Sequence, residues 1–132
     1  LAAAVAQLVT EFELRSGLTL HYENNLGDVQ LVDGAPVALF RILQEALTNI
    51  ERHAKANNVY IDLEGDPAQV RLSVCDDGVG FNINRLEEIH GGIGLRNIRE
   101  RVDHFNGHFS LSSIPGRSEL IITLPTRLRS LA

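Results

Sequence analysis

The 132-residue sequence predicts an α/β protein built as a two-layer sandwich. Two observations support this class. Three segments carry apolar residues at helical spacing, and several shorter segments have the alternating pattern of strands. Most of the expected strands follow one another directly instead of alternating with helices, which argues against a doubly wound parallel sheet. We expect residues 1–132 to form one domain.

The first half of the chain is predicted to form a helix, a strand and a second, stronger helix. From Ala2 to Leu14 apolar residues recur every three or four positions, and Ser16–Gly17 ends that helix. Residues 18–22 alternate as in a strand. Pro36 opens the second helix, because its fixed φ suits the first turn. That helix carries an apolar stripe formed by Leu39, Ile42, Leu43, Ala46, Leu47, Ile50 and Ala54.

The second half is predicted to form a hairpin, a third helix and two closing strands. Gly65-Asp66-Pro67 is the expected hairpin turn. The helix runs from about Gly94 to Phe105 and stops at Asn106–Gly107. The expected strands of this half are 59–63, 70–74, 109–113 and 120–124.

Composition excludes several classes of protein. The net charge of −5 predicts no broad basic surface and no direct contact with nucleic acid. No apolar run is long enough for a membrane span, so we expect no membrane contact by this domain. The single cysteine, Cys75, fits a reducing compartment, and we expect a cytoplasmic location. Because the sequence contains no methionine, we expect a fragment of a larger protein, whose parent can be anchored in the cell membrane.

One edge of the second helix is polar. Glu45, Asn49, Arg52 and His53 lie along the rim of its apolar stripe, where the wall of a pocket would be. Glu45 and Asn49 are four residues apart and share a face. Their oxygens are hard ligands of the kind that Mg²⁺ takes. On this helix alone, an ordinary solvated edge is the simpler interpretation.

Two glycine clusters lie on either side of a short connecting segment. Asp76 comes where the strand 70–74 ends, and Gly78 and Gly80 after it would let a ligand approach the main chain. Gly92 and Gly94 precede a helix whose free N–H groups suit a phosphate. Each cluster alone is equally well explained as a turn.

Together these motifs resemble those of a known family. The run QEALTNIERHA (44–54) closely resembles the N box of histidine kinases, DDGVGF (76–81) their G1 box, and GIGLRNIRERV (92–102) their G2 box. Pro115–Gly116 lies where the family has a closing glycine-threonine turn. The resemblance covers nearly the whole chain. Its details are similar to the subfamily whose kinases pair with response regulators of the LuxR type.

The resemblance implies a Bergerat ATP-binding fold, with a mixed, mostly antiparallel sheet and helices on one face. It also implies the cofactors ATP and Mg²⁺ and a role for each motif. Asn49 would hold Mg²⁺, Glu45 would orient the reacting groups, and Arg52 would be a cation near phosphate. Asp76 would accept from the adenine amino group. The remaining nucleotide-binding positions would be His53, Gly78, Gly80, Gly92 and Gly94, although core packing explains His53 equally well.

The resemblance further implies a protein-histidine kinase that phosphorylates its own dimerisation domain and then serves a response regulator. None of the five histidines has the expected acceptor context, so the acceptor helix is expected upstream of Leu1, and the isolated domain should not phosphorylate itself. The closing turn departs from the family, with Arg117 where glycine is usual, which puts a Ser118 contact to nucleotide in doubt. The alternatives are a conformational ATPase of the gyrase, Hsp90 or MutL type and a nucleotide-binding pseudokinase.

Overall fold

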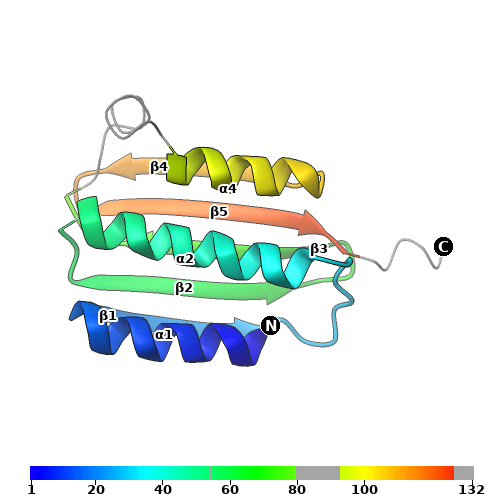
Figure 1. Ribbon diagram of the computed structural model, residues 1–132, viewed down its shortest axis with the longest axis horizontal. Coiled ribbons are helices and arrows are strands. Elements are labelled where there is room, and N and C mark those ends of the chain that lie inside the picture. The colour runs from blue at the N-terminus through cyan, green and yellow to red at the C-terminus, as the bar shows by residue number, and fades with distance from the viewer. Residues whose placement is uncertain (54, 80–92, 127–132) are drawn as a thin grey trace.

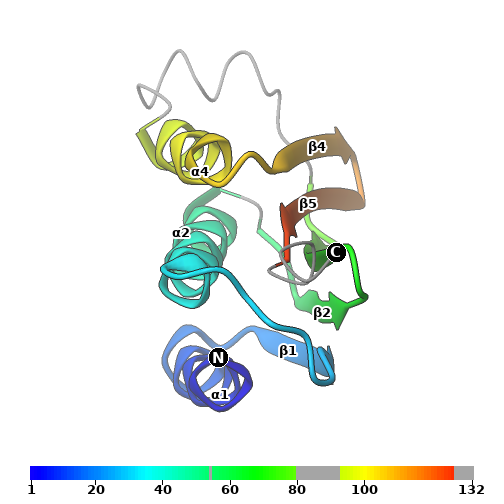
Figure 2. The same cartoon turned by 90° about the vertical axis from the view of Figure 1, so that its right-hand side faces the viewer.

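The computed structural model describes residues 1–53, 55–79 and 93–126, which form two layers. One layer is a five-stranded sheet and the other consists of three helices, all on the same face of the sheet (Figures 1 and 2). The helices are α1 (Ala2–Ser16), α2 (Ala35–His53) and α4 (Ile93–His104), and the strands are β1 (Thr19–Asn25), β2 (Asn58–Gly65), β3 (Gln69–Asp76), β4 (His108–Ile114) and β5 (Arg117–Pro125). The predicted two-layer class and the predicted order of elements are therefore confirmed.

The strands are ordered β1-β2-β3-β5-β4 across the sheet. Only β1 and β2 pair in parallel, and α2 makes the crossover between them. The other pairs are antiparallel, in agreement with the predicted mixed sheet. At the end of β3, Asp76 pairs with Val59 of β2 on one side and with Ser118 of β5 on the other. The sheet thus places the first residue of the predicted G1 motif between two neighbouring strands.

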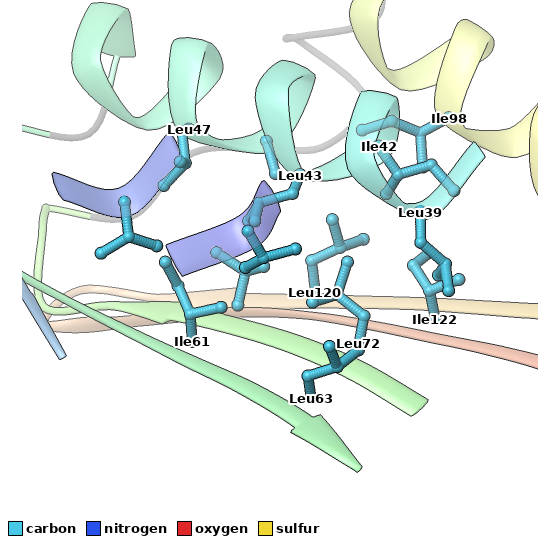
Figure 3. Close-up of a cluster of buried hydrophobic side chains, with 14 of the residues drawn as sticks. Leu39, Ile42, Leu43, Leu47, Ile61, Leu63, Leu72, Ile98, Leu120 and Ile122 are labelled. Carbon is cyan, nitrogen blue, oxygen red and sulfur yellow. The ribbon is translucent and has the colours of Figure 1, made fainter. Parts of the chain in front are cut away.

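The core lies between α2 and the sheet. The apolar stripe of α2 points at the strands, and Leu39, Ile42, Leu43 and Leu47 are almost completely buried there (Figure 3). Ile61, Leu63, Leu72, Leu120 and Ile122 point toward them from the sheet, with Ile98 of α4 beside them. This packing fixes the rotation of α2 about its axis, and therefore the direction in which each of its polar residues points.

The turns fit their sequences. Gly17 ends α1 with φ of 80°, a left-handed conformation that costs glycine little. Pro115 and Gly116 connect β4 to β5, and Gly116 has φ of 90°. Among the helices described, none is both long enough and apolar enough to cross a bilayer.

Candidate nucleotide-binding site

A cavity lies between α2, α4 and the ends of β3 and β5. About 30 Å³ of it is accessible to a water-sized molecule. Four polar residues line it, Asn49 of α2, Asp76 of β3, and Ser118 and Glu119 of β5. Its apolar wall includes Val74, Leu95 and Ile98. The structure thus brings together Asn49 and Asp76, which are far apart in the sequence.

Asp76 is a charged residue in an almost fully buried position. Its residue exposure is 3%, because alternation along β3 turns it to the same side as Val74 and Leu72. Its Oδ1 accepts a hydrogen bond from the Gly78 N–H at 2.9 Å. Among the described residues no donor reaches Oδ2. Burial raises the pKa of the Asp76 carboxyl, the bond from Gly78 opposes that rise, and the charge of Asp77 adds to it. Asp76 is thus almost buried, and its Oδ2, for which the described residues supply no donor, can accept from a ligand in the cavity.

Asn49 is half-buried on the side of α2 that faces the cavity. Its carboxamide is a hard-oxygen donor beside a cavity, which fits a Mg²⁺ ion that keeps most of its ligands as water and phosphate. Within the described ranges there is no cluster of three or more His, Cys, Asp or Glu side chains that could hold a metal by protein groups alone.

Glu45 and Arg52 lie in a different hollow from Asn49. They line a groove over the outer side of α2, together with Phe12 of α1 and Arg101 of α4. Figure 2 shows α2 with α1 on one side and α4 on the other. Among the described residues neither Arg52 nor Arg101 has a hydrogen-bond or ion-pair partner. The polar rim predicted from the sequence is thus divided between the inner cavity and this outer groove.

The glycine motifs are only partly described. Gly78 is buried, and its carbonyl accepts a hydrogen bond of 2.8 Å from the N–H of Gly116. That bond ties the predicted G1 segment to the closing turn. Gly94 lies in the first turn of α4. Gly80 and Gly92 lie outside the described residues, and His53 is the last residue of α2, with a side chain that is not described.

The closing turn places its two unusual residues on opposite sides of β5. Ser118 is 2% exposed and faces the cavity, with its Oγ 2.8 Å from the Oγ of Ser113. Arg117 is exposed, and its guanidinium is 3.4 Å from a carboxylate oxygen of Glu119. Arg117 is not among the residues that line the cavity, although its partner Glu119 is. The apolar alternation of Leu120, Ile122 and Leu124 is the sequence signal that could have placed Ser118 in the wall.

Asp77 is a residue whose role the sequence did not predict. It is exposed, yet its carboxylate accepts three hydrogen bonds, from the backbone N–H groups of Asn57 and Asn58 and from the Asn58 side chain. Each of these bonds is 2.9 Å long. The donors, first those of Asn58 and then Asn57, lower the pKa of Asp77.

Residues 34–128 match the family described as histidine kinase-, DNA gyrase B- and HSP90-like ATPases. The chain belongs to this family. The matched range contains Asn49, Asp76 and both glycine clusters, so the predicted family is confirmed.

Relatives of this ATPase family share both sequence and fold with the chain. The sensor histidine kinase MctS of Rhizobium johnstonii is 34% identical over 95% of the chain, which spans only 27% of that protein. The solved structure of the Acinetobacter baumannii histidine kinase AdeS has a TM-score of 0.75 at 21% identity. The match covers 96% of this chain and 64% of the AdeS chain. A structure of full-length ShkA in complex with AMPPNP has a TM-score of 0.73 at 20% identity, over 92% of this chain and 28% of that one. The predicted ATPase fold of histidine kinases is thereby confirmed.

Proposed function

We propose that this domain binds ATP with Mg²⁺ and transfers the γ-phosphate to a histidine of a separate dimerisation domain, as the catalytic part of a sensor histidine kinase. The observation that carries the proposal is the buried Asp76 carboxylate, which shares one cavity with Asn49. Family membership and the relatives named above support it, among them ShkA, whose structure contains AMPPNP.

The base would lie at the Asp76 end of the cavity. A planar, largely apolar ring suits walls made of Val74, Leu95 and Ile98. The free Oδ2 of Asp76 would accept from the exocyclic amino group of adenine. A carboxylate oxygen for which the described residues supply no donor favours a base that supplies one. Gly78 would line the edge of the same pocket.

The phosphates would lie toward Asn49 and the N-terminus of α4. Asn49 would donate its carboxamide oxygen to Mg²⁺, which, when bound, would neutralise charge on the phosphates. The first N–H groups of α4, at and after Gly94, suit a phosphate because they lack partners within the helix. Gly80 and Gly92 are proposed to take part in the same lid.

Glu45 and Arg52 would act on the outer side of α2, where the acceptor histidine must approach. Imidazole is already a nucleophile, so Glu45 needs only to orient or polarise it. Arg52 would supply a positive charge near the transferred phosphoryl group. Both side chains open onto the groove between α1 and α4, which is accessible to a second domain.

The partners follow from the same proposal. They are the dimerisation domain that carries the acceptor histidine and a response regulator, which we infer to be of the LuxR type. The parent protein would hold this domain in the cytoplasm. Arg117 is the feature that favoured a pseudokinase, and that alternative has less support because Arg117 is not among the residues that line the cavity.

The test combines ATP binding with transfer of label from γ-labelled ATP. The domain alone should bind Mg·ATP and take up no label. When the parent's dimerisation domain is added as a second polypeptide, that polypeptide alone should be labelled, with the acid-labile and base-stable bond of a phosphohistidine. Hydrolysis without labelling would favour the conformational ATPase, and binding without either reaction would favour the pseudokinase.

A further inference from the structure

Asp77 joins two parts of the molecule that carry different halves of the proposed site. Its Oδ1 accepts from the N–H groups of Asn57 and Asn58, and its Oδ2 accepts from the Nδ2 of Asn58. Its own N–H donates to the carbonyl of Asn58 at 3.2 Å. These bonds span 19 and 20 residues of sequence. Asp77 therefore connects the end of β3 to the segment that leaves α2.

The structure describes residues 55–58 of that segment. The segment leads from His53, where α2 ends, to Asn58, where β2 begins, at the same side of the molecule (Figure 1). Lys55 within it has φ of 52°, a left-handed conformation that is unfavourable for a residue with a side chain. The carbonyl of Asn57 also accepts from the N–H of Thr19 at 2.9 Å. The segment is thus held from both β1 and β3.

We propose that Asp77 is a positioning residue for nucleotide recognition: by holding the segment after α2 against the end of β3, it fixes Asp76 relative to Asn49. The inference rests on the proposed function, because it concerns the adenine and metal ends of that site. A hydrogen bond between Asp76 and a base depends on displacements of about half an ångström. The residue adjacent to Asp76, anchored through three bonds, is placed to restrict such displacements.

The side chain of Asn58 shows how specific this arrangement is. Its Oδ1 lies 3.1 Å from Nε2 of His21, while its Nδ2 donates to Asp77. The His21 ring in turn stacks on Tyr60, with ring centroids 4.6 Å apart. The carboxamide is therefore bonded at both ends, and its donor must face Asp77 while its acceptor faces His21. If the carboxamide and the carboxylate exchange positions 58 and 77, every one of these bonds can be preserved.

The exchange provides the experiment. Asp77→Asn alone sets an amide donor against the donor of Asn58, and Asn58→Asp alone sets two carboxylates against each other. In the double variant Asn58→Asp/Asp77→Asn, the amide at position 77 can donate to the carboxylate at 58, while its oxygen still accepts from the two backbone N–H groups. The net charge of the double variant equals that of the wild type.

Binding of ATP and of inosine triphosphate is measured by calorimetry, with Tm recorded for every variant. Inosine carries an oxygen where adenine has its amino group. Each single variant should reduce the ratio of ATP affinity to inosine triphosphate affinity about fivefold to tenfold, the size of a lost buried hydrogen bond. The double variant should return the ratio to within about twofold of wild type.

Asp66 offers a matched control at the opposite end of the same two strands. Its Oδ1 accepts from the N–H groups of Ala68 and Gln69 at 2.7 and 2.8 Å, in the hairpin turn. Asp66→Ala should lower Tm without changing the ratio. If the single variants at 58 and 77 behave like Asp66→Ala, the positioning role is overturned. If the wild type binds neither nucleotide, the proposed function itself fails, and this inference fails with it.

Discussion

Asp76 and Asp77 are neighbours in sequence, yet their carboxylates are in opposite environments. Asp76 is 3% exposed and accepts one hydrogen bond, whereas Asp77 is exposed and accepts three. Burial raises the pKa of Asp76, and the surrounding donors lower the pKa of Asp77. Asp76 is the last residue of β3 and lies on its buried side, whereas Asp77 follows the strand and bonds to Asn57 and Asn58.

This difference suggests that Asp76 serves ligand binding and that Asp77 serves the structure around it. A carboxylate whose oxygens accept several hydrogen bonds from the protein stabilises the fold and has few acceptor sites for a ligand. Among the described residues Asp76 has one donor, and burial inside a cavity raises its pKa, a combination that is typical of a functional site. Asp77 uses its acceptors to hold the chain on which Asp76 is carried. The pair predicts that substitutions at adjacent positions will affect binding and stability in different proportions.

The largest effect is expected for Asp76→Asn. The amide can retain the bond from Gly78 but presents a donor to the adenine amino group, so ATP affinity should fall roughly tenfold or more, from a mismatch of about 1–3 kcal/mol. Tm should be unchanged or higher, because a buried charge has been removed. Calorimetry and thermal unfolding measure the two quantities. A fall in Tm with normal ATP affinity would show that Asp76, like Asp77, has a structural role and does not bind the base.

Asn49→Ala should act on the metal dependence of binding and leave the adenine contacts in place. Wild-type affinity for ATP should increase when Mg²⁺ is added, and the increase should be largely lost in the variant. Titrations with and without Mg²⁺ measure it. An increase as large as in the wild type would remove Asn49 from the metal site.

The free energy of unfolding should depend on pH in opposite ways at the two aspartates, because the pKa of Asp77 is lowered and that of Asp76 is raised. Asp77 has a lowered pKa when folded, so its contribution is present above the ordinary aspartate value and is lost as the pH falls through the lowered one. Asp76 has a raised pKa, so its destabilising charge develops as the pH rises through that raised value.

Denaturant unfolding at a series of pH values compares each asparagine variant with the wild type. The difference for position 77 should be constant above the ordinary aspartate pKa, while the difference for position 76 should still be growing there. Parallel curves for the two positions would contradict the assignment of opposite environments.

The smallest effect is expected for Arg117→Ala. The exposed pair with Glu119 should contribute between about 0 and 1 kcal/mol, and Arg117 is not among the residues that line the cavity. ATP affinity should therefore change less than about twofold, since no cavity contact is lost. A large gain in affinity would show that Arg117 obstructs the site, as its position in the motif had suggested.

The fold was largely predictable from the sequence, because it depends on local patterns. The buried stripe of α2 is read directly from helical spacing, and the described residues of that stripe are all buried. The strand β1 extends to Asn25, beyond the predicted end at Tyr22, since its parallel pairing with β2 continues through polar residues. The alternation of apolar residues in the sequence does not reveal that β2 pairs with these polar residues.

The candidate site was predictable only in part. The motifs identified Asn49 and Asp76, and the structure places both in one cavity. Helical spacing put Glu45 on the same rim as Asn49, but the packing of α1 and α4 beside α2 gives the two residues different surroundings. The partners of Asp77 lie 19 and 20 residues away and depend on how β2 meets β3. These features arise from tertiary contacts, which no local pattern contains.

If Oδ2 of Asp76, which has no donor among the described residues, recognises the adenine amino group, the domain must discriminate between nucleotides by that group. The affinities of the wild type and of Asp76→Asn for ATP and inosine triphosphate are compared by calorimetry. The wild type should prefer ATP by about tenfold or more, the size of a donor–acceptor match against a mismatch. In the variant the amide can donate to the inosine oxygen, so the preference should disappear or reverse. An unchanged preference for ATP in the variant would contradict the account.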